Sequence, residues 1–341
     1  IGLMDSSTGQ TVYIDDPCGK NFDIVHGFWE SFGGTVTVHG ARDLFRWFQE
    51  SGFKSPNRVF DTQTSSYLID PAKGMPHDLV KLAKIHLQKV LQTTDDLLGT
   101  GKARKNWRDL GLTEQSEHAA HLSKACLELR KLFEPELENA GLRELADREI
   151  ELSALLASME RAGIRVEREG LKKLSADFHK RLLELQQKIF KLAGKEFNIG
   201  SPKQLASVLF EDLGLPVLKK TKTGYSTNAE VLEKLAESYE VARVLLEYRK
   251  FEKLINTYVD VLLREIDPQD GRVHCQFGQT ASTTGRLITS EPDLQRTPVK
   301  TEEGRQIRKL FQAEEGCHLL VADWSQVELR IKAQLSEDPD Q

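Results

Sequence analysis

The chain has 341 residues, enough for about two globular domains, and its charged and hydrophobic fractions of 29% and 39% are those of an ordinary soluble fold. A formal net charge of −5 excludes a strongly basic protein, so contacts with a polyanion would have to come from local clusters of lysine and arginine. Because no apolar run is long enough to cross a membrane and the four cysteines form no metal motif, we expect a reduced protein of the cytoplasm.

The N-terminal region, from Ile1 to about Leu98, mixes strands and helices. Alternation over Thr35–Val38 predicts a strand, Asp43–Glu50 predicts a short helix, and Arg58–Asp61 begins another ordered unit. Glycine and lysine are frequent over residues 98–106, which indicates an exposed loop.

Helical periodicity dominates residues 114–192. Two apolar stripes follow helical spacing there, and Gly163 and a short strand over residues 164–166 separate them. The first stripe is Leu152, Leu155, Leu156 and Met159, and the second is Leu171, Leu174, Phe178, Leu182 and Leu185.

Two helix starts and a basic loop follow. Ser201 before Pro202 predicts an N-cap, and Thr227–Glu230 has the spacing of a capping box. Residues 219–227 between them form a basic loop. The next helix is long, with apolar residues at three- and four-residue steps over residues 244–258.

The C-terminal part reads as a sheet. A turn over residues 267–271 precedes a half-buried strand with Val273, Cys275 and Phe277 on one face. Leu319–Ala322 is apolar and predicts a strand covered on both faces, which ends at Asp323. A carboxylate at a strand end suits Mg²⁺, although from the residue type alone a solvated aspartate is the simpler interpretation.

Sequence blocks around Asp323 change that interpretation. Asp-Trp-Ser-Gln-Val-Glu-Leu-Arg-Ile at 323–331 resembles the first polymerase signature of family A DNA polymerases, the bacterial DNA polymerase I type. Upstream blocks strengthen the resemblance in the same order: Thr-Gly-Arg-Leu at 284–287, Glu-Pro-Asp-Leu-Gln at 291–295 and Thr-Glu-Glu-Gly-Arg-Gln-Ile-Arg at 301–308. The likeness extends more weakly over almost the whole chain.

The resemblance implies a fold of the α/β plus α+β class. Residues 1–135 would form a degenerate, incomplete ribonuclease H-like 3′–5′ exonuclease domain, and 136–341 the N-terminal part of a polymerase domain. The thumb would occupy about 197–265 and a partial palm about 266–341. Because the chain starts at Ile1 and stops inside a polymerase module, we expect a fragment, inactive alone, that lacks the fingers and the second catalytic aspartate.

The implied activity is template-directed nucleotidyl transfer in DNA replication and repair. In the complete enzyme, a primer 3′-hydroxyl would attack the α-phosphate of a deoxyribonucleoside triphosphate, assisted by two Mg²⁺ ions. By resemblance, Asp323 is a catalytic metal ligand and the backbone carbonyl of Trp324 also faces a metal. We further expect a monomer, associated with the nucleoid, with no membrane partner.

Glu328 has three interpretations. The resemblance implies a steric gate that lies where a ribose 2′-hydroxyl would go. Ser325–Glu328 also has capping-box spacing, and a pair with Lys332 four residues on is a third role. Capping and gating are compatible, and we favour the gate.

The resemblance also implies DNA contacts. Arg286, after Gly285 in a turn between strands, would contact the primer-terminal pair in the minor groove, where acceptors are nearly the same for every base pair. Gln295 and Lys300 would follow the DNA backbone, while Asp293 and Arg296 replace the asparagines of the family pattern. A solvated hairpin arginine is the plain alternative for Arg286.

Lys219, Lys220 and Lys222 lie where the family has its thumb tip. Clustered lysines in a loop suit phosphate binding without reading the bases, although such clusters are also common on surfaces that bind nothing.

The exonuclease signatures are incomplete. Asp43 falls at the second signature and would be a vestigial metal ligand, but the third has His118 and Leu122 in place of the tyrosine and aspartate of the family. Since leucine cannot bind a metal, we expect no proofreading. His118 and His121 could ligate a transition metal, which we do not favour. A non-catalytic DNA-binding protein that keeps the fold is the rival function.

Overall fold

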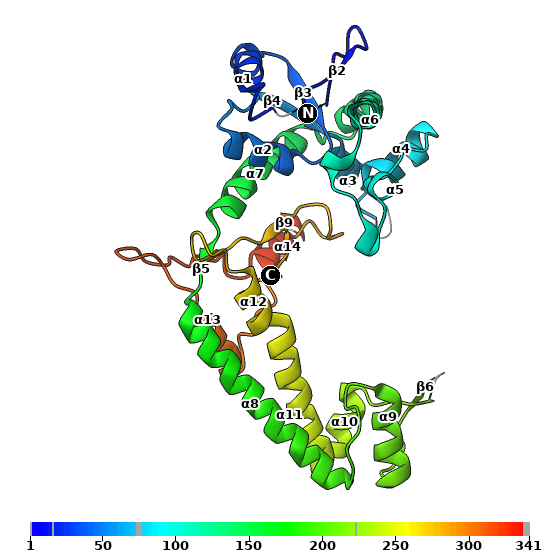
Figure 1. The fold of residues 1–341 in the computed structure, drawn as a ribbon, viewed down its shortest axis with the longest axis vertical. Coiled ribbons are helices and arrows are strands. Elements are labelled where there is room, and N and C mark those ends of the chain that lie inside the picture. The colour runs from blue at the N-terminus through cyan, green and yellow to red at the C-terminus, as the bar shows by residue number, and fades with distance from the viewer. Residues whose placement is uncertain (1, 16, 73–76, 222–223, 337–341) are drawn as a thin grey trace. The chain divides into compact units, whose positions relative to one another are not determined.

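The computed structural model describes residues 2–15, 17–72, 77–221 and 224–336. The chain forms two compact units (Figure 1). Unit 1 comprises Ile1–Gly163 and His274–Arg296, and unit 2 comprises Ile164–Val273 and Thr297–Gln341. The chain therefore leaves unit 1 after Gly163, returns to it for the segment 274–296, and ends in unit 2.

Unit 1 opens with two small sheets. β1 (Gly2–Met4) pairs antiparallel with β2 (Thr11–Tyr13), and α1 (Phe22–Ser31) follows them. The predicted strand is β3 (Thr35–Val38), which pairs in parallel with β4 (Arg58–Asp61). A parallel pair needs a crossover connection, and the predicted helix, α2 (Ala41–Ser51), provides it.

The rest of the N-terminal segment is helical. Its helices are α3 (Thr62–Ile69), α4 (Leu79–Leu87), α5 (Thr94–Leu98), α6 (Leu112–Asn139) and α7 (Arg143–Ala162), with short 3-10 turns at Gly101–Ala103 and Trp107–Asp109. An apolar cluster lies where α3 and α4 pack on α6, around Leu82, Leu129 and Phe133. These residues are almost completely buried, which fixes the helices around β4.

The predicted apolar stripe on α7 is correct only in part. Leu156 is buried, but Leu155 and Met159 are exposed, and the buried face also carries Ser153, Ala157 and Glu160. Because Ala157 packs against Ala41 and Phe45, α2 helps to set which face of α7 is buried. The polar members of this face bond to the segment 274–296.

That segment forms a hairpin in unit 1. β9 (Gln276–Gly278) pairs antiparallel with β10 (Ile288–Ser290), with Phe277 opposite Thr289. The predicted continuous strand over residues 273–277 is interrupted, because β8 (Arg272–Val273) pairs instead with β5 (Ile164–Arg165) in unit 2. Val273 and Cys275 are buried as predicted, with the half-buried His274 between them, but Phe277 is only half-buried, like Gln276.

Unit 2 is built on two long helices that lie side by side (Figure 1). α8 (Arg168–Ala193) buries the predicted stripe against α11 (Glu240–Leu254), with the rings of Phe178 and Phe251 at 5.2 Å. The remaining elements are α9 (Pro202–Ser207), a π-helical turn (Val208–Asp212), β6 (Lys220–Thr221), β7 (Gly224–Tyr225), α10 (Ala229–Ala236), a second π-helical turn (Ile255–Val259), α12 (Asp260–Glu265), α13 (Glu302–Arg308) and α14 (Val327–Ser336).

Both predicted helix starts in unit 2 exist, but one has a different cap. Ser201 caps α9 by accepting the amide of Gln204, as predicted. α10 begins one residue later than expected, since Asn228 accepts the amide of Val231 at 3.1 Å. Thr227 is committed elsewhere: its carbonyl and hydroxyl oxygens accept from Arg249.

The predicted buried strand over Leu319–Ala322 is not formed. Leu319, Leu320 and Val321 are 54%, 93% and 89% exposed. A strand needs a hydrogen-bonded neighbour, and no strand in the described part of the chain pairs with these residues.

The predicted boundary at residues 135 and 136 falls inside α6, which continues through Pro135 to Asn139. The compact units divide the chain elsewhere, and the names exonuclease-like, thumb and palm stay predictions. Across the described residues, no helix has both the length and the apolar character that a bilayer span requires.

Candidate nucleic-acid interface and metal site

Arg286 lies on the connection between β9 and β10. Gly285 has a φ of +74°, a left-handed conformation that glycine adopts without strain, and Arg286 follows it on the exposed side of the turn. The turn between strands expected from the sequence is therefore present, and it places the arginine at the end of a hairpin.

Gln295 supports this hairpin through its amide group. Its Oε1 accepts the amide of Thr289 at 3.1 Å, and its Nε2 donates to the carbonyl of Leu287 at 3.0 Å. Asp293 accepts the hydroxyl of Thr289 at 3.2 Å and pairs with Arg296 at 3.2 Å. Gln295 thus shares a unit with Arg286, and its contacts here are internal to the protein.

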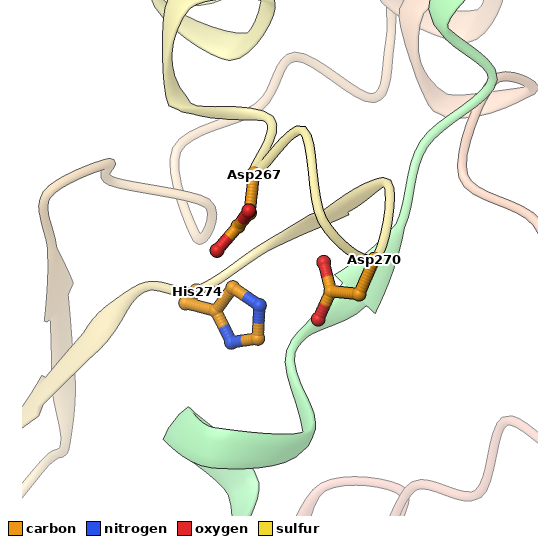
Figure 2. Close-up of side chains that lie close together, drawn as sticks. All are labelled: Asp267, Asp270 and His274. Carbon is orange, nitrogen blue, oxygen red and sulfur yellow. The ribbon is translucent and has the colours of Figure 1, made fainter.

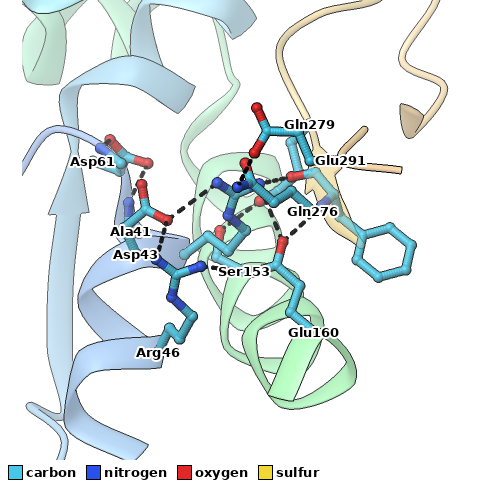
Figure 3. Close-up of polar contacts among 12 residues, drawn as sticks. Ala41, Asp43, Arg46, Asp61, Ser153, Glu160, Gln276, Gln279 and Glu291 are labelled. Atoms are coloured by element: carbon cyan, nitrogen blue, oxygen red, sulfur yellow. Dashed lines mark hydrogen bonds and ion pairs between the residues drawn. The ribbon is translucent and has the colours of Figure 1, made fainter. Parts of the chain in front are cut away.

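Glu160 was missed by the sequence analysis and is central to unit 1 (Figure 3). It is 4% exposed on α7, and its Oε1 accepts the backbone amide of Phe277 at 2.6 Å. Arg42 of α2 pairs with Glu160 at 3.2 Å and donates to the carbonyl of Phe277, while Arg46 lies 3.8 Å from its other oxygen. The signal available was helical spacing from Ser153, since both fall on one face seven residues apart.

These contacts occupy the side of β9 that faces away from β10. Gln279 extends them, since its Nε2 donates to the carboxylate of Glu149 at 2.7 Å and its Oε1 accepts the hydroxyl of Ser153 at 2.8 Å (Figure 3). Side chains of α2 and α7 therefore satisfy the backbone groups of β9 that a third strand would otherwise pair with. These bonds hold the β9 end of the hairpin in place.

Asp323, Trp324 and Glu328 all belong to unit 2, in the exposed stretch before and within α14. Among the described residues no hydrogen bond or ion pair involves the Asp323 carboxylate, and the Trp324 side chain is 80% exposed. α14 begins at Val327, so Glu328 is its second residue. A capping box from Ser325 would place it third, one position later.

The basic loop forms a small hairpin in unit 2. β6 pairs antiparallel with β7, Lys220 lies over the ring of Tyr225 at 5.8 Å, and Lys219 pairs with Glu230 at 3.6 Å. Lys222 lies outside the described residues. Lys300 is exposed in the same unit. The exposed lysines on the hairpin suit contact with phosphates, as expected from the sequence.

Asp43 lies in the first turn of α2 and is 60% exposed, beside a pocket of about 160 Å³. Its carboxylate pairs with Arg42 at 3.1 Å. The buried carboxylate at this helix start is instead Asp61, which accepts the amides of Gly40, Ala41 and Gln63 at 2.9 Å and the hydroxyl of Thr64 at 3.0 Å. Asp61 therefore caps the N-terminus of α2 by accepting its first backbone amides.

His118 and Leu122, the residues expected at a third exonuclease signature, both lie on α6. Leu122 packs against a cluster that includes Ala83, Leu91 and Ala125. His118 is buried with its ring 5.7 Å from that of Trp107, and burial, followed by the neighbouring His121, lowers the pKa of His118. Among the described residues neither histidine belongs to a cluster of three potential metal ligands.

A turn before β8 carries Asp267 and Asp270, drawn with His274 in Figure 2. Asp267 accepts the amide of Gln269 at 2.7 Å, and Asp270 accepts the amide of Arg272 at 2.9 Å. His274 donates through Nδ1 to the carbonyl of Glu160 at 2.8 Å. Each side chain has a local structural role, and we assign no metal to them.

A family model of DNA polymerase family A matches residues 168–340, half of the chain. The chain belongs to DNA polymerase family A. The resemblance identified from the blocks around Asp323 is confirmed, and the match begins at α8 and runs through the exposed stretch that carries Asp323 and Glu328.

Relatives and a solved structure agree with this family A assignment. DNA polymerase I of Geobacillus stearothermophilus is 41% identical over 285 residues, which cover 82% of this chain and 32% of that protein. DNA polymerase I of Chloroflexus aurantiacus is 35% identical over 329 residues, or 94% of this chain and 35% of that protein. The POL domain of Pol1 from M. smegmatis, in complex with DNA primer-template and dNTP, matches with a TM-score of 0.81 and 31% identity over 99% of this chain and 56% of that chain. The chain thus has the family A polymerase fold and spans about a third of the length of these curated relatives.

The role of Asp61 can be tested by the substitution Asp61→Asn. The amide keeps the size of the side chain but presents an NH₂ group to backbone amides that also donate. The free energy of unfolding of unit 1 should therefore fall by about 1.5–3 kcal/mol. The control is Asp43→Asn, an exposed carboxylate at the same helix start, which should cost less than about 1 kcal/mol. Urea unfolding followed by tryptophan fluorescence measures both, and equal losses would contradict this assignment.

Proposed function

We propose that this chain is part of a DNA-directed DNA polymerase that extends a primer with deoxyribonucleotides. The observation that carries the proposal is the block at 323–331, which lies inside the match to DNA polymerase family A and places an exposed carboxylate before a helix. The POL domain from M. smegmatis was solved with DNA primer-template and dNTP, and we infer the same partners for this protein.

Asp323 would hold a catalytic Mg²⁺ ion. Its carboxylate is exposed, with no partner among the described residues, and is a hard oxygen donor of the kind Mg²⁺ takes. The carbonyl of Trp324 would add a second oxygen. The bound metals would supply charge neutralisation at the reacting phosphate. One carboxylate, even if it bridges two ions, offers too few oxygen ligands to hold both, so a further aspartate would complete the site. By this reasoning the chain alone extends no primer.

Two groups of residues would hold the DNA. Arg286 would contact the primer-terminal pair in the minor groove, with Gln295 and Lys300 along the backbone. Lys219, Lys220 and Lys222 would bind phosphates at the tip of the thumb, which we place at about residues 197–265, without reading sequence. The exposed apolar stretch Leu319–Val321 would become a palm strand when the remainder of a longer polymerase covers it.

Unit 1 supports a degenerate, ribonuclease H-like exonuclease domain that has lost its chemistry. The parallel pair β3 and β4 with α2 between them supports the α/β part, and Leu122 in an apolar cluster supports the loss. We also infer a monomer of the cytoplasm, associated with the nucleoid through its DNA. The rival, a non-catalytic DNA-binding protein, would keep the same surfaces and fail to extend a primer.

The polymerase proposal is tested by Asp323→Ala in the full-length gene product. Loss of a metal ligand should lower the rate of primer extension by roughly a hundredfold or more, which exceeds what indirect supports of a metal usually cost. The control is Glu315→Ala, an exposed acid eight residues earlier, which should leave the rate unchanged. If the unsubstituted protein binds primer–template and extends nothing, the non-catalytic rival replaces the proposal.

Absence of proofreading is tested on a mismatched primer end, with Mg²⁺ and no nucleotides. We expect no shortening of the primer by the full-length protein, because leucine at 122 cannot bind a metal. Shortening that disappears in Asp43→Ala would show that the exonuclease site still works and that Asp43 belongs to it.

The gate at Glu328 is tested by Glu328→Ala, with Glu328→Gln as the matched control. Removing the side chain should open space for a 2′-hydroxyl and raise the ratio of kcat/KM for ribonucleotides over deoxyribonucleotides by roughly tenfold or more. Glutamine keeps the bulk and should keep most of the discrimination. A capping role predicts instead a loss of about 0.5–2 kcal/mol in stability with an unchanged ratio.

A further inference from the structure

A single hydroxyl in unit 1 holds both sides of the turn that carries Arg286. Tyr67 Oη donates to the carbonyl oxygen of Ser282 at 2.5 Å and accepts the backbone amide of Gly285 at 3.0 Å. Arg286 is the next residue along the chain. Tyr67 therefore fixes the backbone conformation immediately before the arginine.

Tyr67 is itself held firmly in place. It lies on α3, is 9% exposed, and its ring meets that of His77 edge to face at 5.5 Å. Ser66, the preceding residue, bonds through its hydroxyl to Nδ1 of His77 at 3.0 Å. Because the ring cannot move without disturbing α3, its hydroxyl is a fixed point for the turn.

The hairpin needs such outside support. A hairpin of two three-residue strands is marginal by itself in water, so its turn would sample many conformations. Glu160 and Arg42 fix the base of the hairpin at Phe277, and Tyr67 fixes the far end at Ser282 and Gly285. Arg42 on α2 and Tyr67 on α3 lie in the segment 1–135, whose exonuclease chemistry we infer to be lost, while Glu160 lies on α7 beyond it.

We propose that Tyr67 is a positioning residue for Arg286, and that the exonuclease-like segment of unit 1 serves polymerisation by presenting this arginine to the primer–template duplex. The inference rests on the DNA contact of Arg286 in the proposed function. The physical basis is preorganisation: an arginine on an ordered turn loses less conformational freedom when it meets the duplex, and so binds it more tightly. Tyr67 touches neither DNA nor nucleotide in this account.

The test is Tyr67→Phe in the full-length protein. Phenylalanine keeps the buried ring and removes only the hydroxyl, so the Kd for a primer–template duplex should rise by roughly three- to tenfold, the range that the loss of one hydrogen-bonding group allows. Exchange of the Gly285 backbone amide with solvent should become faster. The matched control is Tyr13→Phe in the same unit, whose hydroxyl donates to Gln115 at 2.6 Å and should leave both measurements unchanged.

A double substitution shows whether Tyr67 acts through Arg286. In an Arg286→Ala background, Tyr67→Phe should add no further loss of affinity, because the side chain that it positions is gone. If Tyr67→Phe lowers affinity by the same factor with and without Arg286, it acts on general stability and the proposal is wrong.

Different results would contradict the positioning role of Tyr67 and the DNA contact of Arg286. Normal affinity in Tyr67→Phe beside weakened binding in Arg286→Ala overturns the positioning role and leaves the DNA contact intact. Normal binding and extension in Arg286→Ala overturns the DNA contact, and the positioning role with it, while the test of Asp323 remains independent of both.

Discussion

The backbone amide and carbonyl of β9 need hydrogen-bond partners, and this need determines how α2 and α7 contact β9 in unit 1. Phe277 presents its amide and carbonyl on the side away from β10, where a wider sheet would have another strand. Glu160 accepts from the amide of Phe277, and Arg42 donates to its carbonyl. The two side chains also form an ion pair with each other. Such a buried pair contributes less to stability than to geometry, because burying both charges costs about as much as their attraction returns. Its value here is that it fixes one strand in one position.

Sequence analysis located several elements because their signals are local. The strand at Thr35–Val38, the helix containing Asp43 and the stripe led by Leu171 each follow from periodicity within one segment. The family was recognisable for a similar reason, since the block at 323–331 is contiguous.

The errors concern features that depend on partners distant in sequence. The buried face of α7 is set by α2 and β9, so a stripe chosen for apolar content was wrong for Leu155 and Met159. Leu319–Ala322 has strand composition, but no strand among the described residues pairs with it. Glu160 and Tyr67 could not be selected from the sequence, because an acid or a tyrosine in a helix is ordinary until its partner at Phe277 or Gly285 is known. The candidate site residues themselves could be predicted from the sequence. The residues that hold them in place, such as Glu160 and Tyr67, could not.

The pairing of β5 with β8 has a topological consequence. Ile164 lies opposite Val273, so the segment between them starts and finishes on neighbouring hydrogen-bonded strands. Adjacent strands are about 4.8 Å apart, so the two ends of the segment lie close together. Bringing them together costs conformational entropy, and the β5–β8 hydrogen bonds offset part of that cost. Residues 164–273 therefore start and finish at one place within unit 2. Lengthening or shortening α8 and α11 together would leave both strands where they are, so the length of this helix pair can vary between proteins while the β5–β8 pairing stays the same.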